Sequence, residues 1–191
     1  MPMSALILPY KGVTPTIDPS AFIAPNAAII GDVEIGADSS IWFSCTLRGD
    51  IQAIRVGKRT NIQDGTVVHV QGKGLGCFVG DEVTVGHTAI LHACTLQDRS
   101  FVGMQACAMD GSVIESNAML AAGALLTPGK RIPSGQLWAG RPARYLRDLT
   151  EADIAEIADS ARRYAETAKA HHASYGGEGA GRERYFSVTF T

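Results

Sequence analysis

Three of the five histidines in this sequence, His69, His87 and His92, lie close together in the middle of the chain. Any one of them, taken alone, is most simply an exposed turn residue. Three neutral imidazoles with an open fourth position, however, form the ligand set of one class of catalytic zinc centre. A metal ion held in this way lowers the pKa of its bound water to about 7 and so supplies hydroxide near neutral pH. The three histidines are therefore candidate metal ligands.

The elements that must position these histidines are indicated by aliphatic residues that recur every six positions. This period fits neither the α-helix nor simple strand alternation, but it fits short strands joined by tight corners. Three edges make one triangular coil, and stacked coils bury a continuous aliphatic column. We therefore predict an all-β solenoid, a parallel β-helix of six to seven coils. The repeated residues are Ile17, Ile23, Ile29, Ile35, Ile41 and Leu47; Val56, Ile62 and Val68; Val79 and Val85; and Ile90, Leu96, Val102, Ala108, Ile114, Leu120, Leu126 and Ile132.

Glycine directly follows several of the repeated aliphatic residues, and we expect these glycines to adopt the backbone conformations that corners require. They are Gly36, Gly57, Gly80, Gly86 and Gly103.

The repeat also predicts where the histidines lie on the coil. If the glycine-rich segment Gln71–Cys77 is a loop outside the coil, three edges separate Val68 from Ile90. His69 and His92 then lie at one corner, one coil apart, at the strand spacing of about 4.8 Å. His87 lies at a different corner. A threefold homotrimer that packs unlike corners together would bring His69 and His92 of one chain to His87 of the next. This prediction fails if the loop instead fills an extra edge.

The chain divides into four segments. We expect an N-terminal segment over residues 1–16, the β-helix over 17–137, an exit turn and C-terminal α-helix over 138–175, and a flexible tail over 176–191. Thr150 and Asp153 have the spacing of a capping-box variant, which predicts a helix start and an end near Ala173. One face of that helix would pack along the prism through Ile154, Ile157, Ala158, Ala161, Ala165 and Ala168.

Composition excludes several function classes. A net charge of −2 and a pI near 6.2 give no electrostatic footprint for nucleic acid. The longest apolar run, Ala118–Leu126, is far shorter than the roughly 20 residues of a membrane helix, and the N-terminus lacks a secretory pattern. We expect a soluble cytoplasmic protein with neither nucleic-acid nor membrane partners. Its four cysteines show no CxxC spacing and read as reduced thiols, with a Cys45–Cys94 redox pair as the alternative.

Three motifs together resemble the gamma-class carbonic anhydrases. They are Arg48-Gly49-Asp50, the segment from Asn61 to His69, and the segment from Val85 to His92. The resemblance covers roughly residues 10 to 170. It implies a left-handed β-helix, a homotrimer, and reversible hydration of carbon dioxide to bicarbonate by metal-bound hydroxide.

The resemblance also implies residue roles. His69 and His92 would ligate the metal from one subunit and His87 from its neighbour, in agreement with the corner count. Gln63 would hold the metal-bound hydroxide through its amide, and Asn61 would orient carbon dioxide or bicarbonate. Arg48 and Asp50 match the family's interface pair, although a simple surface ion pair is the alternative. Tyr164 lies where relatives carry an active-site tyrosine on the helix.

Metal identity, proton transfer and two rival functions stay open. Zn²⁺ is the expected cofactor, with Fe²⁺ or Co²⁺ as alternatives, because three histidines do not choose among them. The family's founding members carry an acidic proton-shuttle loop, whereas Gln71–Cys77 contains no carboxylate. Turnover would then be slow or need another proton carrier. The rival functions are acyl-coenzyme A acyltransferase or thioesterase, suggested by the exit segment Gly140–Arg144, and a non-catalytic scaffold subunit.

Overall fold

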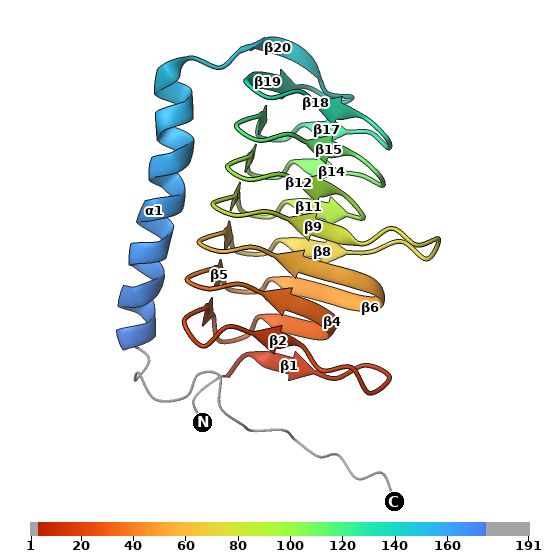
Figure 1. Ribbon diagram of the computed structural model, residues 1–191, viewed down its shortest axis with the longest axis vertical. Helices are drawn as coiled ribbons and strands as arrows, with labels where there is room; N and C mark the ends of the chain where they lie inside the picture. Colours follow the sequence, from red (N-terminus) through yellow and green to blue (C-terminus); the bar gives the residue numbers. More distant parts are fainter. Residues whose placement is uncertain (1–3, 175–191) are drawn as a thin grey trace, which may run out of the picture.

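The computed structural model describes residues 4–174 and shows a triangular parallel β-helix of about seven turns with one α-helix along its side (Figure 1). Each turn contributes a strand to each of three faces, named A, B and C in the order in which the chain visits them. All strand pairs are parallel except the last, between β19 and β20. The predicted fold class is confirmed.

Face A carries the strand ends that matter for the candidate site. Its strands are β1 (Leu6–Leu8), the first part of β4 (Ala28–Ile35), the first part of β6 (Thr46–Val56), β8 (Val67–His69), β11 (Ile90–His92), β14 (Cys107–Ala108) and β17 (Leu125–Leu126).

Face B continues from face A, since β4 and β6 run around the corner between them and join both faces into one sheet. Its other strands are β2 (Thr16–Ile17), β9 (Cys77–Val79), β12 (Thr95–Leu96), β15 (Val113–Ile114) and β18 (Arg131–Ile132).

Face C is a separate sheet, and its last strand caps the end of the prism. Its strands are β3 (Phe22–Ile23), β5 (Ser40–Ile41), β7 (Asn61–Ile62), β10 (Thr84–Val85), β13 (Phe101–Val102), β16 (Met119–Leu120), β19 (Gln136–Ala139) and β20 (Arg144–Asp148).

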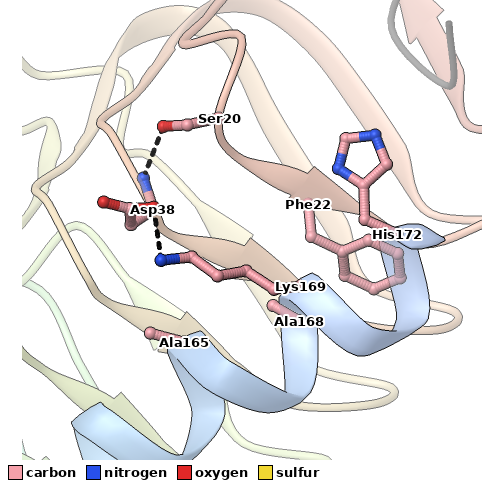
Figure 2. Close-up of a pocket in the computed structure, with 7 residues that line it drawn as sticks. All are labelled: Ser20, Phe22, Asp38, Ala165, Ala168, Lys169 and His172. Carbon is pink, nitrogen blue, oxygen red and sulfur yellow. Dashed lines mark hydrogen bonds and ion pairs between the residues drawn. The ribbon is translucent and has the colours of Figure 1, made fainter. Parts of the chain in front are cut away.

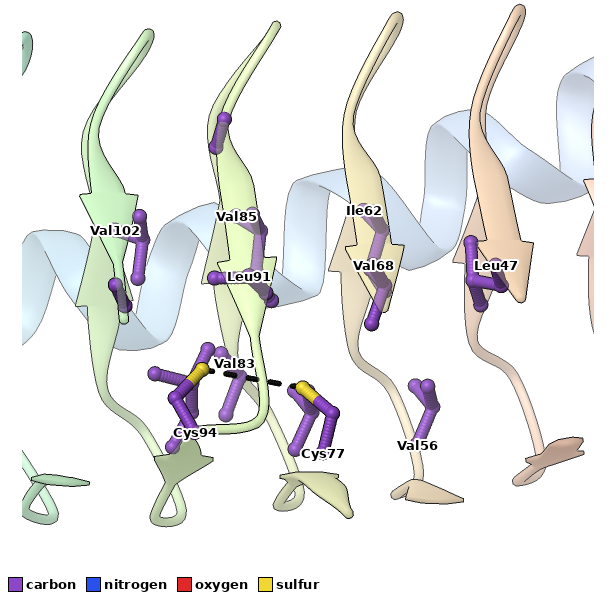
Figure 3. Close-up of a cluster of buried hydrophobic side chains, with 14 of the residues drawn as sticks. Leu47, Val56, Ile62, Val68, Cys77, Val83, Val85, Leu91, Cys94 and Val102 are labelled. Carbon is purple, nitrogen blue, oxygen red and sulfur yellow. Dashed lines mark hydrogen bonds between the residues drawn. The ribbon is translucent and has the colours of Figure 1, made fainter. Parts of the chain in front are cut away.

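The core is a column of aliphatic side chains from all three faces, and Figure 3 shows its middle coils. Fully burying one such side chain stabilises the fold by roughly 1.5–3 kcal/mol, so the column is the main source of stability. One predicted core residue is wrong: Ile90 is 46% exposed, and Leu91 is buried in its place. Leu91 pairs in register with Val68 of the preceding coil. Because Ile90 and Leu91 are adjacent aliphatic residues, the period of six alone did not decide between them.

The glycines that follow the repeated aliphatic residues have a different role from the one predicted. Gly36, Gly57, Gly80, Gly86 and Gly103 do not have positive φ angles, which occur at other corner positions such as Asn26 and Thr88. A Cβ atom on Gly36 would lie 2.8 Å from the carbonyl oxygen of Gly57 in the next coil. Glycine is therefore required here because successive coils approach closely.

The glycine-rich segment does leave the coil, as predicted. It connects β8 to β9 as a projecting loop (Figure 1), closed by a bridge between Gln71 and Leu75. Immediately after it, Cys77 lies in the core with its Sγ 3.9 Å from that of Cys94 (Figure 3). Cys45 instead directs its Sγ to the backbone oxygen of Gln63, 3.1 Å away. The structure thus places Cys77, and not Cys45, beside Cys94, and all four thiols are free.

Helix α1 (Glu151–Ser174) packs along face C, against β3, β5, β7 and β10. The predicted capping interaction is present, since Thr150 Oγ1 accepts from Asp153 N at 3.2 Å and Asp153 Oδ2 accepts from Thr150 N at 2.7 Å. The buried face differs in part from the prediction: Ile154 and Ala158 are exposed, while the polar Ser160 is buried. The predicted tail, 176–191, lies outside the described residues.

Candidate metal centre

His69 and His92 face each other across neighbouring coils. They are the last residues of β8 and β11, and the ladder between these strands places His92 directly opposite His69. Each follows an inward residue, Val68 or Leu91, so both imidazoles point outward where face A turns into face B. His69 Nδ1 lies 3.2 Å from His92 Nε2.

A carboxylate holds the other nitrogen of each of these two rings. His69 Nε2 lies 3.0 Å from Asp50 Oδ1, and His92 Nδ1 lies 2.5 Å from Asp110 Oδ1. Metal-ligating histidines almost always donate their other ring N–H to a partner of this kind, a carboxylate, a backbone carbonyl or a water molecule. Two nitrogens, each about 2.0–2.1 Å from a tetrahedral zinc ion, are about 3.3 Å apart. The donor set therefore fits two of the three ligands of a metal centre.

Asp50 links His69 to Arg48, which pairs with the other carboxylate oxygen in the same chain. Burial opposes ionisation of Asp50, but hydrogen bonds from His69 and Arg48 outweigh it and hold the pKa of Asp50 below its usual value. Asp50 is therefore a carboxylate at neutral pH. It can fix the orientation of the His69 ring, a contact that the sequence did not predict.

His87 lies away from this pair, in the turn from face C to face A that precedes β11. Its Nδ1 lies 2.9 Å from Asp64 Oδ2, and its side chain is 39% exposed. Face A thus begins near His87 and ends at His92. Within residues 4–174 of one chain, no three His, Cys, Asp or Glu side chains are gathered so that they could hold a metal ion.

Asn61 and Gln63 lie on the same side of the prism as His87 and are almost fully buried. Gln63 donates from Nε2 to Asn61 Oδ1 at 3.0 Å, and Asn61 donates from Nδ2 to Thr84 Oγ1 at 2.9 Å. The two amides are therefore held in a fixed orientation. The Cys45 thiol lies 3.1 Å from the backbone oxygen of Gln63, and burial raises the pKa of this thiol to about 12, so it stays protonated.

Tyr164 projects from α1 toward the same corner. Its ring packs edge-on against Trp42, with centroids 5.6 Å apart. Burial and the negative charge of Asp64 raise the pKa of the Tyr164 hydroxyl, which therefore stays protonated at neutral pH. The small cleft further along the helix, between Phe22 and Lys169 (Figure 2), is lined by none of the predicted site residues.

Two carboxylates at the histidines escaped sequence reasoning. Asp110 is 18 residues from His92 and Asp64 precedes His87 by one coil, so neither contact is local in sequence. The signal that could have found Asp110 is the coil length itself, because residues about one coil apart stack. A search for acids at that offset from each histidine would have selected it.

Known proteins share both the sequence and the fold. No protein-family model matches the chain. It is 43% identical to a carbonic anhydrase of Geobacillus kaustophilus, covering 84% of this chain and 88% of that protein. It is also 51% identical to gamma carbonic anhydrase 1, mitochondrial, of Arabidopsis thaliana, over 83% of this chain. The chain belongs to the gamma carbonic anhydrase family. It spans about 60% of the length of that Arabidopsis relative.

One solved structure that is similar to this gamma carbonic anhydrase family member is named as a transferase. It is a hexapeptide transferase family protein from Anaplasma phagocytophilum, with 51% identity, a TM-score of 0.84, and coverage of 87% of this chain and 98% of that chain. The plant relative is named as mitochondrial, so the cytoplasmic location expected from sequence stays a prediction. Over residues 4–174, no helix is long and apolar enough to cross a membrane.

Proposed function

We propose that the protein catalyses the reversible hydration of carbon dioxide, CO₂ + H₂O ⇌ HCO₃⁻ + H⁺, at a divalent metal shared between two subunits of a homotrimer. The observation that carries this proposal is the pair of facing imidazole nitrogens of His69 and His92, each ring held by its own carboxylate. An acyltransferase needs a histidine base, but it has no use for two imidazoles directed at one point. Family membership supports the same reaction.

The third ligand would come from His87 of a neighbouring subunit. Face A supports this arrangement, because Val67 and Ile90, which pair in the β8–β11 ladder, are 41% and 46% exposed. Exposed apolar side chains on face A are suited to a subunit interface. Packing face A of one chain against a neighbour would cover them and bring unlike corners together.

A bound Zn²⁺, or Fe²⁺ or Co²⁺ in its place, would lower the pKa of a water molecule and make it a nucleophile near neutral pH. His69, His92 and the neighbour's His87 would hold the ion. Asp50, Asp110 and Asp64 would keep each ring oriented. Arg48 would act through Asp50, by fixing the position of that carboxylate.

Gln63 and Asn61 would orient the reacting groups. Gln63 Nε2 donates to Asn61, which orients the amide so that Oε1, its accepting end, can receive a hydrogen bond from the nucleophile. The amides would thereby orient the nucleophile toward carbon dioxide. Tyr164, protonated at neutral pH, would serve as a hydrogen-bond donor at the edge of the site.

The released proton needs a carrier. The projecting loop at residues 71–76 contains Lys73 and no carboxylate, so we expect protons to leave to solvent buffer. Hydration should therefore accelerate as the concentration of a buffer such as imidazole rises.

Stopped-flow measurement of carbon dioxide hydration tests the proposal. The protein is loaded with zinc or, anaerobically, with iron, in concentrated buffer. We expect metal-dependent hydration that is lost in His87→Ala and retained in His172→Ala, which removes a histidine at the far end of α1. A fully metallated protein that does not hydrate carbon dioxide contradicts the proposal, and hydrolysis of acyl-coenzyme A by the same sample would favour the rival enzyme class.

A further inference from the structure

A chain of four buried side chains connects helix α1 to Gln63. Thr84 donates from Oγ1 to Ser160 Oγ at 3.2 Å, which continues the bonds from Gln63 to Asn61 and from Asn61 to Thr84. The exposed fractions are 6% for Ser160 and at most 4% for the other three. Buried polar groups without partners are costly, so each member depends on its neighbour.

The bonds of the relay run in one direction in the structure, from Gln63 toward Ser160. The Thr84 hydroxyl has one proton, and this proton is committed to Ser160. Thr84 Oγ1 can then only accept from Asn61, which places the Asn61 amide nitrogen toward Thr84 and its oxygen toward Gln63. The Asn61 oxygen in turn selects the nitrogen end of the Gln63 amide. Ser160 is the last group of the chain and comes from a different element, 76 residues from Thr84.

We infer that Ser160 is a positioning residue, which sets the orientation of the Gln63 amide through Thr84 and Asn61 and so presents Gln63 Oε1 to the reacting groups. The consequence for catalysis rests on the proposed function, whereas the hydrogen-bond relay does not. Helix α1 then does more than cover face C, since Ser160 accepts the Thr84 proton, and the backbone oxygen of Val83 favours the same orientation of the Asn61 amide.

Loss of the acceptor has a defined consequence. In Ser160→Ala the Thr84 proton has no partner on the helix and turns toward Asn61. The Asn61 amide then gains by reversing, and the Gln63 amide reverses with it. The backbone oxygen of Val83, 3.4 Å from Asn61 Nδ2, opposes this reversal only weakly. Ser160→Thr keeps the hydroxyl, and Thr84→Val removes the link entirely.

Nuclear magnetic resonance of the metal-free protein tests the relay without any enzymatic assay. The probes are the side-chain NH₂ signals of Asn61 and Gln63, assigned with Asn61→Asp and Gln63→Glu. We expect slow hydrogen exchange in the parent and in Ser160→Thr, and exchange at least fivefold faster in Ser160→Ala and Thr84→Val. Thr167→Ala is the matched control, because the Thr167 hydroxyl donates to Arg163 O on the same helix. Parental exchange of Gln63 in both Ser160→Ala and Thr84→Val would overturn the relay.

Kinetics test the consequence. In Ser160→Ala we expect kcat for hydration to fall about five- to thirtyfold, the effect of disturbing one hydrogen bond among buried groups. The metal content and the mass of the assembly should stay unchanged. Ser160→Thr should restore most of it. Parental kcat in Ser160→Ala would overturn the positioning role. A parent protein without hydration activity would instead contradict the proposed function, and the exchange measurement would still decide the relay.

Discussion

Nδ1 of His69 and Nε2 of His92 lie 3.2 Å apart although 23 residues separate them in the sequence. The coil length explains this contact, because the parallel ladder between β8 and β11 places equivalent positions of successive coils side by side. The projecting loop after His69 lengthens the chain without disturbing that register. An insertion at a corner therefore leaves the two rings facing each other.

The carboxylate partner of His92 should matter for metal affinity. Asp110→Asn keeps the shape of the side chain but removes the charge that orients and polarises the His92 ring. We expect metal affinity to fall about 10- to 100-fold, measured by competition with a chromogenic chelator. Asp148→Asn, on β20, is the control and should bind metal like the parent. Equal affinity in the Asp110 variant would show that this carboxylate does not support a ligand.

Ile90 should report on the subunit interface. Glu in place of Ile90 would bury a charge if face A packs against a neighbour, and an unpaired buried charge is strongly destabilising. For Ile90→Glu we expect analytical ultracentrifugation to show single chains of 20.2 kDa in place of trimers. Ile154→Glu, at an exposed position on α1, should leave the mass of the assembly unchanged. A trimer that survives Ile90→Glu would place the interface elsewhere.

The β-helix and the placement of His69 and His92 at one corner were predictable from the sequence. The residue of β11 that points into the core, Leu91, was not. The same core packing repeats in every coil of the prism, so the aliphatic residues recur at a regular spacing that can be recognised in the sequence. The choice between Ile90 and Leu91 depends on a five-residue step from Leu91 to Leu96. Such local shortening of one edge does not follow from periodicity.

Gly57 tests the spacing between coils. A Cβ atom at this position would lie 2.6 Å from the backbone of Gly80 in the next coil. Because backbone on both sides must shift, Gly57→Ala should destabilise the protein by about 1–3 kcal/mol, measured by denaturant unfolding. In Gly72→Ala the new atom would meet only Ile51 Cδ1, at 3.5 Å. Equal stability of the two variants would contradict close approach as the reason for glycine.

The start of α1 should contribute stability that depends on pH. The Arg147 guanidinium and the backbone N–H of Thr150 hold the pKa of Asp153 well below its usual value. A lowered folded-state pKa stabilises above the unfolded pKa, about 3.9, and the effect is lost as pH falls through the folded-state value. Asp153→Asn should therefore lower the Tm at pH 7, and the difference from the parent should shrink in strong acid. A constant difference would refute the charge effect; Glu151→Gln is the control.

The outer residues of the candidate site were harder to predict than its histidines. Asp110 and Asp64 reach their histidines across coils, and Ser160 reaches Thr84 from a helix whose placement on face C follows from no repeat. The predicted helix face selected apolar positions and therefore omitted Ser160. Contacts between elements of different periodicity depend on how those elements dock, and one sequence does not specify this.

Mixing two inactive variants tests most directly whether one site is built from two subunits. His69→Ala and His87→Ala should each lack metal and carbon dioxide hydration. When the two variants are unfolded, mixed and refolded, some interfaces pair an intact His69 and His92 with an intact His87. Such mixed trimers should recover both metal binding and hydration, at a fraction of the parental level. Mixed trimers that form but recover neither would contradict a metal centre shared between neighbouring chains.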